Sequence, residues 1–169
     1  MRYLALALDY DGTAASDGTL SDAASSAIER LRTSGRRVVL VTGRRIGDLL
    51  RVLPTSTLFD LIVAENGAVI YDPQSREQIP LAAPLTARFA ERLRERGVAP
   101  LEEGAVVVAT HDPHGGVMLE VIRELGLEIH VIFNRGAVMA LPPGINKATG
   151  LDGAQTRNVP TRSRRNWRR

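Results

Sequence analysis

The sequence predicts a doubly wound α/β protein that carries a smaller α+β insert, and three observations lead to this prediction. Short apolar runs without a helical period alternate with stretches of helical period over residues 3–71. Polar strings follow the apolar runs where buried strands would end. From about residue 72 the pattern changes to charged helices and an antiparallel hairpin. Alternating strands and helices indicate a parallel sheet with right-handed crossovers.

The first part of the chain begins with an apolar run at residues 3–8, which suits a buried parallel strand. Ser21 can cap a helix in which Ile28 and Leu31 recur at helical spacing, and Gly35 ends it. The elements expected after it are strands at residues 38–41, 61–64 and 69–71 and a short helix at residues 46–50. The last two of these strands flank Asn66-Gly67, a hairpin signal.

The second part has a different order of elements. We expect helices at residues 85–96 and 117–125, and strands at residues 106–109, 128–133 and 137–141. The last two strands are joined at Asn134-Arg135-Gly136. The predicted organisation is therefore a core of residues 1–80 with 143–152, an inserted domain of residues 81–142, and a basic, disordered tail of residues 153–169.

The charge of the chain is unevenly distributed. The 169 residues have a formal net charge of +3, but six arginines lie after Gly153, where there is no acid. The preceding part has more acids than bases, so the basic balance is no argument that the folded part binds nucleic acid. A tail that binds nucleic acid would lose affinity steeply with added salt, and this reading ranks below an enzyme.

Composition also excludes several classes of protein. Cysteine is absent, which excludes disulfides, thiolate catalysis and cysteine-ligated zinc. No apolar run approaches the roughly 20 residues that span a bilayer. Charge enters the N-terminal segment too early for a signal peptide, so we expect a cytoplasmic protein without a membrane partner.

The string Asp9-Tyr10-Asp11-Gly12-Thr13 follows the first predicted strand, at the sheet edge where open α/β sheets bind ligands. Of two carboxylates spaced in this way, one can attack an electrophile while the other exchanges protons with a leaving oxygen. Gly12 allows a sharp turn that exposes backbone amides to an anion. A capped turn without chemistry is the alternative interpretation.

Two further strings complete the pattern. Thr42-Gly43-Arg44 follows the second strand and supplies a hydroxyl, while Lys147 opens a candidate helix after the insert. Each is ordinary when taken alone. Carboxylates, a hydroxyl and an ammonium group at the ends of successive elements together fit a site for a phosphoryl group.

These strings carry a resemblance to a known family. The segments in question, in chain order, are LDYDGT, LVTGR, VAENGAVIYD and LPPGINKATGL. In order and spacing they resemble the haloacid dehalogenase (HAD) superfamily, in the Cof-like branch with an α/β cap between the second and third motifs. The resemblance covers most of residues 2–151 and implies a Rossmann-like core.

The resemblance also implies roles for individual residues. Asp9 would be the nucleophile that forms an aspartyl-phosphate, and Asp11 would protonate the leaving alcohol and then activate water. Thr42 would bind phosphoryl oxygens, and Lys147 would balance the negative charge. Mg²⁺ would bind the Asp9 carboxylate and the Asp11 backbone carbonyl. The residues left for binding phosphate or substrate are Gly12, Thr13, Gly43, Arg44 and Asn66.

Some residues keep two interpretations. Asn66 and Gly67 either contact substrate or form a plain hairpin turn. His111 and His114 have the spacing of a metal pair on a helix but straddle Asp112-Pro113 in an expected loop, so substrate contact is preferred to metal binding. The family's fourth motif, an acidic G-D-x-x-x-D-like string, is missing after Lys147.

The sequence therefore predicts a Mg²⁺-dependent phosphatase that acts on a small phosphorylated metabolite, with sugar phosphates as the expected class. Absence of the fourth motif predicts impaired turnover. The alternatives are a phosphomutase with the same aspartate chemistry and a HAD-like binding protein of low activity. An incomplete sheet next to the first strand also predicts self-association.

Overall fold

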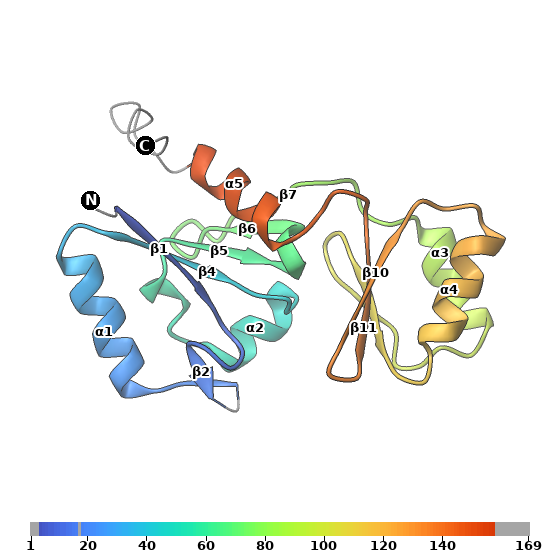
Figure 1. The fold of residues 1–169 in the computed structure, drawn as a ribbon, viewed down its shortest axis with the longest axis horizontal. Coiled ribbons are helices and arrows are strands. Elements are labelled where there is room, and N and C mark those ends of the chain that lie inside the picture. The colour runs from blue at the N-terminus through green and yellow to red at the C-terminus, as the bar shows by residue number, and fades with distance from the viewer. Residues whose placement is uncertain (1–3, 17, 158–169) are drawn as a thin grey trace.

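The computed structural model describes residues 4–16 and 18–157, which form two lobes (Figure 1). One lobe contains a five-stranded sheet of order β1-β4-β5-β6-β7, and the other a four-stranded sheet of order β10-β11-β9-β8. The strands of the second lobe are thus hydrogen-bonded to one another and not to the first sheet. Within the described part of the chain, no helix has the length and apolar character needed to cross a membrane.

The first lobe is built from both ends of the described chain. Its elements are β1 Ala5–Asp9, β2 Ala15–Ser16, β3 Thr19–Leu20, α1 Asp22–Thr33, β4 Arg37–Val41, α2 Ile46–Val52, η1 Ser56–Leu58, β5 Leu61–Ala64, η2 Glu65–Gly67, β6 Val69–Tyr71, β7 Gln78–Pro80 and α5 Lys147–Arg157. Strands β1, β4 and β5 are parallel, while β6 and β7 are antiparallel additions. The predicted α/β fold is confirmed.

Helices cover both faces of this sheet. Val38, Leu40 and Ile62 pack toward α1 and α2 in one apolar cluster. The alternate residues of the strands, such as Leu61 and Val63, pack against α5 on the opposite face. This alternation follows from the two-residue period of a strand, whose successive side chains point to opposite faces.

The second lobe has helices on one face of its sheet. Its elements are α3 Ala87–Glu95, β8 Glu102–Glu103, β9 Val108–His111, α4 Gly115–Glu124, β10 His130–Asn134 and β11 Ala137–Leu141. Phe89 and Leu93 of α3 pack with Met118 and Val121 of α4 and with Val138 of β11. This lobe therefore has an apolar core of its own.

The last helix extends beyond the boundary expected from the sequence. α5 continues to Arg157, so residues 153–157 are helical and not part of a disordered tail. Ala154 is buried against Val63 and Ile70. Because this contact is made by a single methyl group, the sequence of this turn has no apolar pattern that would predict it. The predicted tail over residues 158–169 lies outside the described residues.

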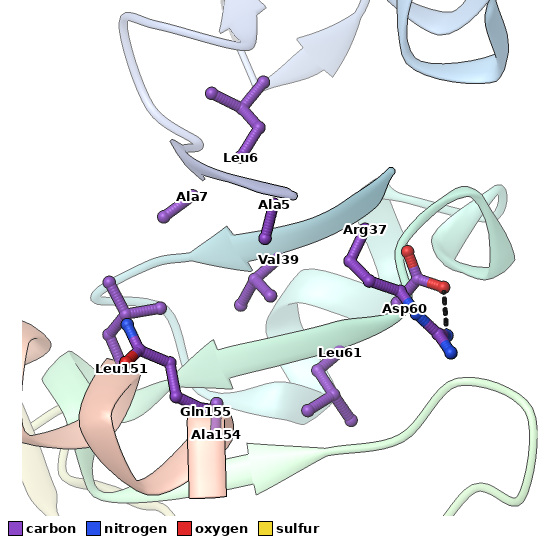
Figure 2. A pocket seen from close by; sticks show the side chains of 10 residues that line it. All are labelled: Ala5, Leu6, Ala7, Arg37, Val39, Asp60, Leu61, Leu151, Ala154 and Gln155. Atoms are coloured by element: carbon purple, nitrogen blue, oxygen red, sulfur yellow. Dashed lines mark hydrogen bonds and ion pairs between the residues drawn. The ribbon is translucent and has the colours of Figure 1, made fainter. Parts of the chain in front are cut away.

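β1 forms one edge of the described sheet. Beside it lies an open groove of about 220 Å³, lined by Ala5 and Ala7 of β1, Val39 of β4, and Leu151 and Ala154 of α5 (Figure 2). α5 covers β5 and β6 but leaves this strip of the sheet open. The exposed apolar edge predicted from the sequence is thus present among the described residues.

Candidate active site

Three polar segments meet at the carboxyl edge of the parallel strands. Asp9 is the last residue of β1, Thr42 directly follows β4, and Asn66 lies in η2 after β5. Ligands of open α/β sheets bind at this edge because the strand-to-helix loops gather there. α5 brings Lys147, its first residue, to the same place.

Asp9 and Lys147 form an ion pair. Nζ of Lys147 lies 2.5 Å from Oδ1 of Asp9, and both side chains are partly exposed, at 46% and 39%. Oδ2 of Asp9 accepts no hydrogen bond from the residues that the structure describes. The carboxylate is therefore oriented through one oxygen, and the other is available to a substrate.

Close backbone packing places Lys147. A Cβ atom on Gly67 would lie 2.0 Å from the carbonyl oxygen of Asn146, and one on Gly150 would lie 2.5 Å from Cα of Gly67. Any side chain at these two positions would push α5 away from η2. The glycines of the NG and ATG strings thus allow the helix to approach closely enough for Lys147 to reach Asp9.

Arg44 holds Asp11 through both carboxylate oxygens. Its Nη2 lies 2.7 Å from Oδ1, and its Nε lies 3.0 Å from Oδ2. The hydrogen bond to Asp11 raises the pKa of Arg44. The same guanidinium lies 5.5 Å from the ring centre of Tyr10, which is fully buried and whose pKa is raised by burial.

Backbone N–H groups of the loop after β1 donate hydrogen bonds to carbonyl groups of the same loop. Gly12 has a φ of +79°, its N–H donates to the carbonyl of Ala15, and the N–H of Thr13 donates to the carbonyl of Tyr10. Thr42 is buried, and its hydroxyl oxygen accepts the N–H of Arg44 at 3.1 Å. These contacts stabilise the turns from which Asp11 and Arg44 project.

A cavity of about 690 Å³ lies between the lobes at this edge. The residues predicted from the sequence that line it are Asp9, Asp11, Gly43, Arg44, Asn66 and Lys147. Gly12, Thr13 and Thr42 are next to it but are not among its lining residues. The second lobe contributes residues that the sequence did not single out as a site, including Asn134, Arg135 and Met139.

Glu65 is a structural link that sequence reasoning missed. The residue is 1% exposed, and its carboxylate accepts backbone N–H groups of Ala105, Val106 and Val107 at 2.9, 3.0 and 3.3 Å. Three hydrogen bonds satisfy a buried charge that would otherwise be costly. The acid directly before Asn66-Gly67 was the available signal, and it ties the first lobe to the segment between β8 and β9.

The two histidines have different surroundings. His111 lines the cavity, whereas Nε2 of His114 lies 2.9 Å from the carbonyl oxygen of Ala99. Over residues 4–16 and 18–157, no cluster of three or more histidine, aspartate or glutamate side chains could hold a metal ion.

Solved structures with the same fold include three of particular interest. A haloacid dehalogenase-like hydrolase from Bacteroides thetaiotaomicron is 19% identical with a TM-score of 0.71, and the match covers 92% of this chain and 77% of that chain. A sugar phosphatase of HAD subclass IIB is 17% identical with a TM-score of 0.67, over 90% and 75%. The C-terminal domain of trehalose-6-phosphate phosphatase from C. albicans is 20% identical with a TM-score of 0.62, over 85% and 58%. At these identities the likeness shows the fold.

A separate finding shows the family to which the chain belongs. The sequence model of the haloacid dehalogenase-like hydrolases matches residues 6–100, which is more than half of the chain. This stretch contains the Asp9 and Thr42 strings and the Glu65-Asn66-Gly67 turn. The chain therefore belongs to the haloacid dehalogenase-like hydrolases.

Proposed function

We propose that this hydrolase is a Mg²⁺-dependent phosphatase of small phosphorylated metabolites, with sugar phosphates as the substrate class. The observation that carries the proposal is the Asp9 carboxylate, held by Lys147 at the wall of a cavity that also contains Asp11. The similar structures named above include a sugar phosphatase and a trehalose-6-phosphate phosphatase, which supports this substrate class.

Asp9 acts as the nucleophile. Its carboxylate oxygen attacks phosphorus, and the bond from phosphorus to the alcohol oxygen breaks. Asp11, released by Arg44 when substrate binds and then protonated, gives that oxygen its proton. Water then attacks phosphorus, Asp11 takes the proton of the water, and the bond from phosphorus to Asp9 breaks. Inorganic phosphate and the free alcohol are the products, and both carboxyl groups return to their initial states.

Cationic side chains supply charge stabilisation. Phosphoryl transfer depends mainly on positioning and on neutralising oxygen charge. Lys147 offsets the charge of Asp9 and of the bound phosphoryl group, and Arg44 can donate to a phosphoryl oxygen as it does to Asp11. Thr42, behind the cavity wall, accepts the N–H of Arg44 and so fixes the backbone from which Arg44 projects. Gly12, Thr13, Gly43 and Asn66 shape the surrounding turns.

Mg²⁺ is the proposed cofactor, and the donors present fit it. The Asp9 carboxylate and the backbone carbonyl of Asp11 would hold the ion, with water and substrate phosphate as the other ligands. Mg²⁺ sites usually combine one or two carboxylates with phosphate and water, so a cluster of protein ligands is not required. When bound, the ion would supply Lewis-acid stabilisation of phosphoryl oxygen charge.

The second lobe acts as a cap in this proposal. Residues 81–142 form the cap, and residues 1–80 with the chain from 143 form the core. The cavity between them takes residues from both lobes. Closer approach of the cap when substrate binds would exclude water from the reacting phosphoryl group. The contacts of Glu65 with residues 105–107 hold the lobes together on one side of the cavity.

An assay of p-nitrophenyl phosphate and a panel of hexose phosphates tests this proposal, with the release of inorganic phosphate as the measure of hydrolysis. We expect hydrolysis that requires Mg²⁺ and is lost in Asp9→Asn. Asp22→Asn, on the far helix α1, is the matched control and should keep the activity of the parent chain. Hydrolysis that is equally fast without divalent metal, or that survives in Asp9→Asn, would reject the proposal.

A further inference from the structure

Arg135 extends from the second lobe toward the loop that carries Asp11. It lies at the tip of the β10–β11 hairpin and lines the cavity. A Cβ atom on Gly12 would lie 3.8 Å from Nη2 of Arg135. The guanidinium group thus faces the reacting end of the cavity from the side opposite the sheet edge.

The turn that presents Arg135 does not by itself favour an arginine. Asn134 pairs with Ala137, so the hairpin has a two-residue loop, and Arg135 and Gly136 have φ values of +50° and +81°. Positive φ at both central residues is typical of type I′ turns, whose first central position favours asparagine, aspartate or glycine. A residue with a Cβ in the left-handed region costs about 1 kcal/mol, so the turn itself gives no reason for an arginine at this position.

The charge of Arg135 is also unmatched. The other basic side chains that line the cavity each have an acidic partner: Lys147 pairs with Asp9, Arg44 with Asp11, Arg45 with Asp48 and Glu102, and Arg51 with Asp48. Arg135 makes no hydrogen bond or ion pair with any residue in the described ranges. One positive charge is therefore left to be balanced by a ligand.

We propose that Arg135 binds a second anionic group of the substrate, a carboxylate or a phosphate on the alcohol part of the ester. This inference rests on the proposed phosphatase function. Arginine is suited to such a group because its planar fork donates two parallel hydrogen bonds to carboxylate or phosphate oxygens. A cavity of about 690 Å³ has room for an alcohol part beyond the phosphoryl group at Asp9.

Two pairs of probes test the proposal, since the members of each pair differ by one anionic group. The first pair is 3-phosphoglycerate and glycerol 3-phosphate, for a carboxylate, and the second is fructose 1,6-bisphosphate and fructose 6-phosphate, for a phosphate. Affinity is measured by calorimetry in an Asp9→Asn background, which prevents turnover, and kcat/KM is measured in the parent chain. We expect at least one doubly anionic probe to be favoured by about tenfold or more, the range of a charge-assisted hydrogen bond.

Arg135→Gln should lower affinity for the doubly anionic probe much more than for the singly anionic one and so abolish the preference, while Arg135→Lys should keep part of it. Arg76→Gln is the matched control, because Arg76 is also an exposed arginine with positive φ but lies in the turn before β7, away from the cavity. Equal affinity for both members of both pairs, or a preference that survives in Arg135→Gln, would overturn the proposal.

The two proposals fail in different ways. Turnover without a preference would reject the Arg135 subsite and leave the phosphatase proposal standing. A preference in binding that depends on Arg135, without turnover of any ester, would support the subsite and reject the phosphatase. If no probe binds, both are rejected.

Discussion

Nζ of Lys147 lies 2.5 Å from Oδ1 of Asp9, although 138 residues separate the two in the chain. The contact joins the first strand to the last helix, across the whole second lobe. Both side chains are partly exposed, so the pair contributes about 1 kcal/mol or less to the free energy of unfolding. We therefore expect the ion pair to matter mainly for catalysis, because it places the positive charge of Lys147 next to the phosphoryl group.

Lys147→Met should lower phosphatase activity by about 10²-fold, because it removes a charge-stabilising donor. The midpoint of thermal unfolding should change little. Steady-state kinetics with p-nitrophenyl phosphate measure the loss of activity, and calorimetry measures the midpoint of unfolding. A large loss of stability with normal activity would show that the pair is a structural contact.

Lys147 is the only lysine in the 169-residue sequence, which makes a chemical test selective. An amine-reactive acylating reagent can modify only Lys147 and the N-terminal amine. Inorganic phosphate or vanadate should slow acylation of Lys147 and leave the N-terminal amine unaffected, as followed by peptide mass spectrometry. Equal slowing at both amines would contradict a phosphate site at Lys147.

Gly150→Ala should destabilise the protein by about 1–3 kcal/mol, because its Cβ would meet Cα of Gly67 at 2.5 Å. Activity should fall as well, since α5 would move Lys147 away from Asp9. Gly116→Ala is the matched control in helix α4, where a Cβ meets nothing within 4 Å. That change should stabilise the protein by about 0.5–1 kcal/mol. Similar effects of the two substitutions on unfolding would refute the packing argument.

Asp11→Asn should slow hydrolysis of glycerol 3-phosphate by about 10²–10⁴-fold, the range for loss of a general acid and base. With p-nitrophenyl phosphate the leaving group departs without a proton, so only the second step needs Asp11. Stopped-flow absorbance should then show a burst of one nitrophenolate per active site, followed by slow turnover. Undiminished steady-state rates on both esters would exclude Asp11 as the acid and base.

The sheet-edge residues of the site were predictable from the sequence, whereas the residues that the second lobe contributes to the cavity were not. Asp9, Thr42 and Asn66 follow apolar runs, and parallel strands necessarily bring such residues to one sheet edge. Arg135 and Met139 reach the cavity only because the second lobe lies over that edge, which is a tertiary arrangement without a local pattern.

The end of α5 shows the same limit on a smaller scale. Residues 153–157 have no apolar period, and Ala154 is buried by a single methyl contact that no hydrophobic pattern indicates. Glu65 is a further example, because the backbone amides that it binds lie about 40 residues away in the chain.

The open edge of β1 predicts self-association with a second copy of the chain. The carbonyl of Leu4 accepts the N–H of Arg37, and the N–H of Tyr10 donates to the carbonyl of Val41. Alternate residues of a parallel strand bond to the same neighbour, so the N–H and C=O groups of Ala5 and Ala7 face away from β4. An antiparallel pairing of β1 with its own copy would satisfy both edges by two-fold symmetry.

Leu6→Lys tests this pairing, since Leu6 is 42% exposed on β1. The substitution should shift the chain from dimer toward monomer in analytical ultracentrifugation. Leu119→Lys, at 36% exposure on α4, should leave the distribution unchanged. A parent chain that is monomeric at all concentrations would contradict the prediction.

The central claim, that Asp9 attacks the phosphoryl group, is tested most directly by trapping the phosphorylated enzyme. The chain is mixed with a phosphate monoester and Mg²⁺, quenched in acid, and analysed by intact-protein and peptide mass spectrometry. The account predicts a phosphoryl group on Asp9, increased in Asp11→Asn because its hydrolysis is slowed, and absent in Asp9→Asn. Phosphate release that continues in Asp9→Asn, or a phosphoryl group on another residue, would contradict it.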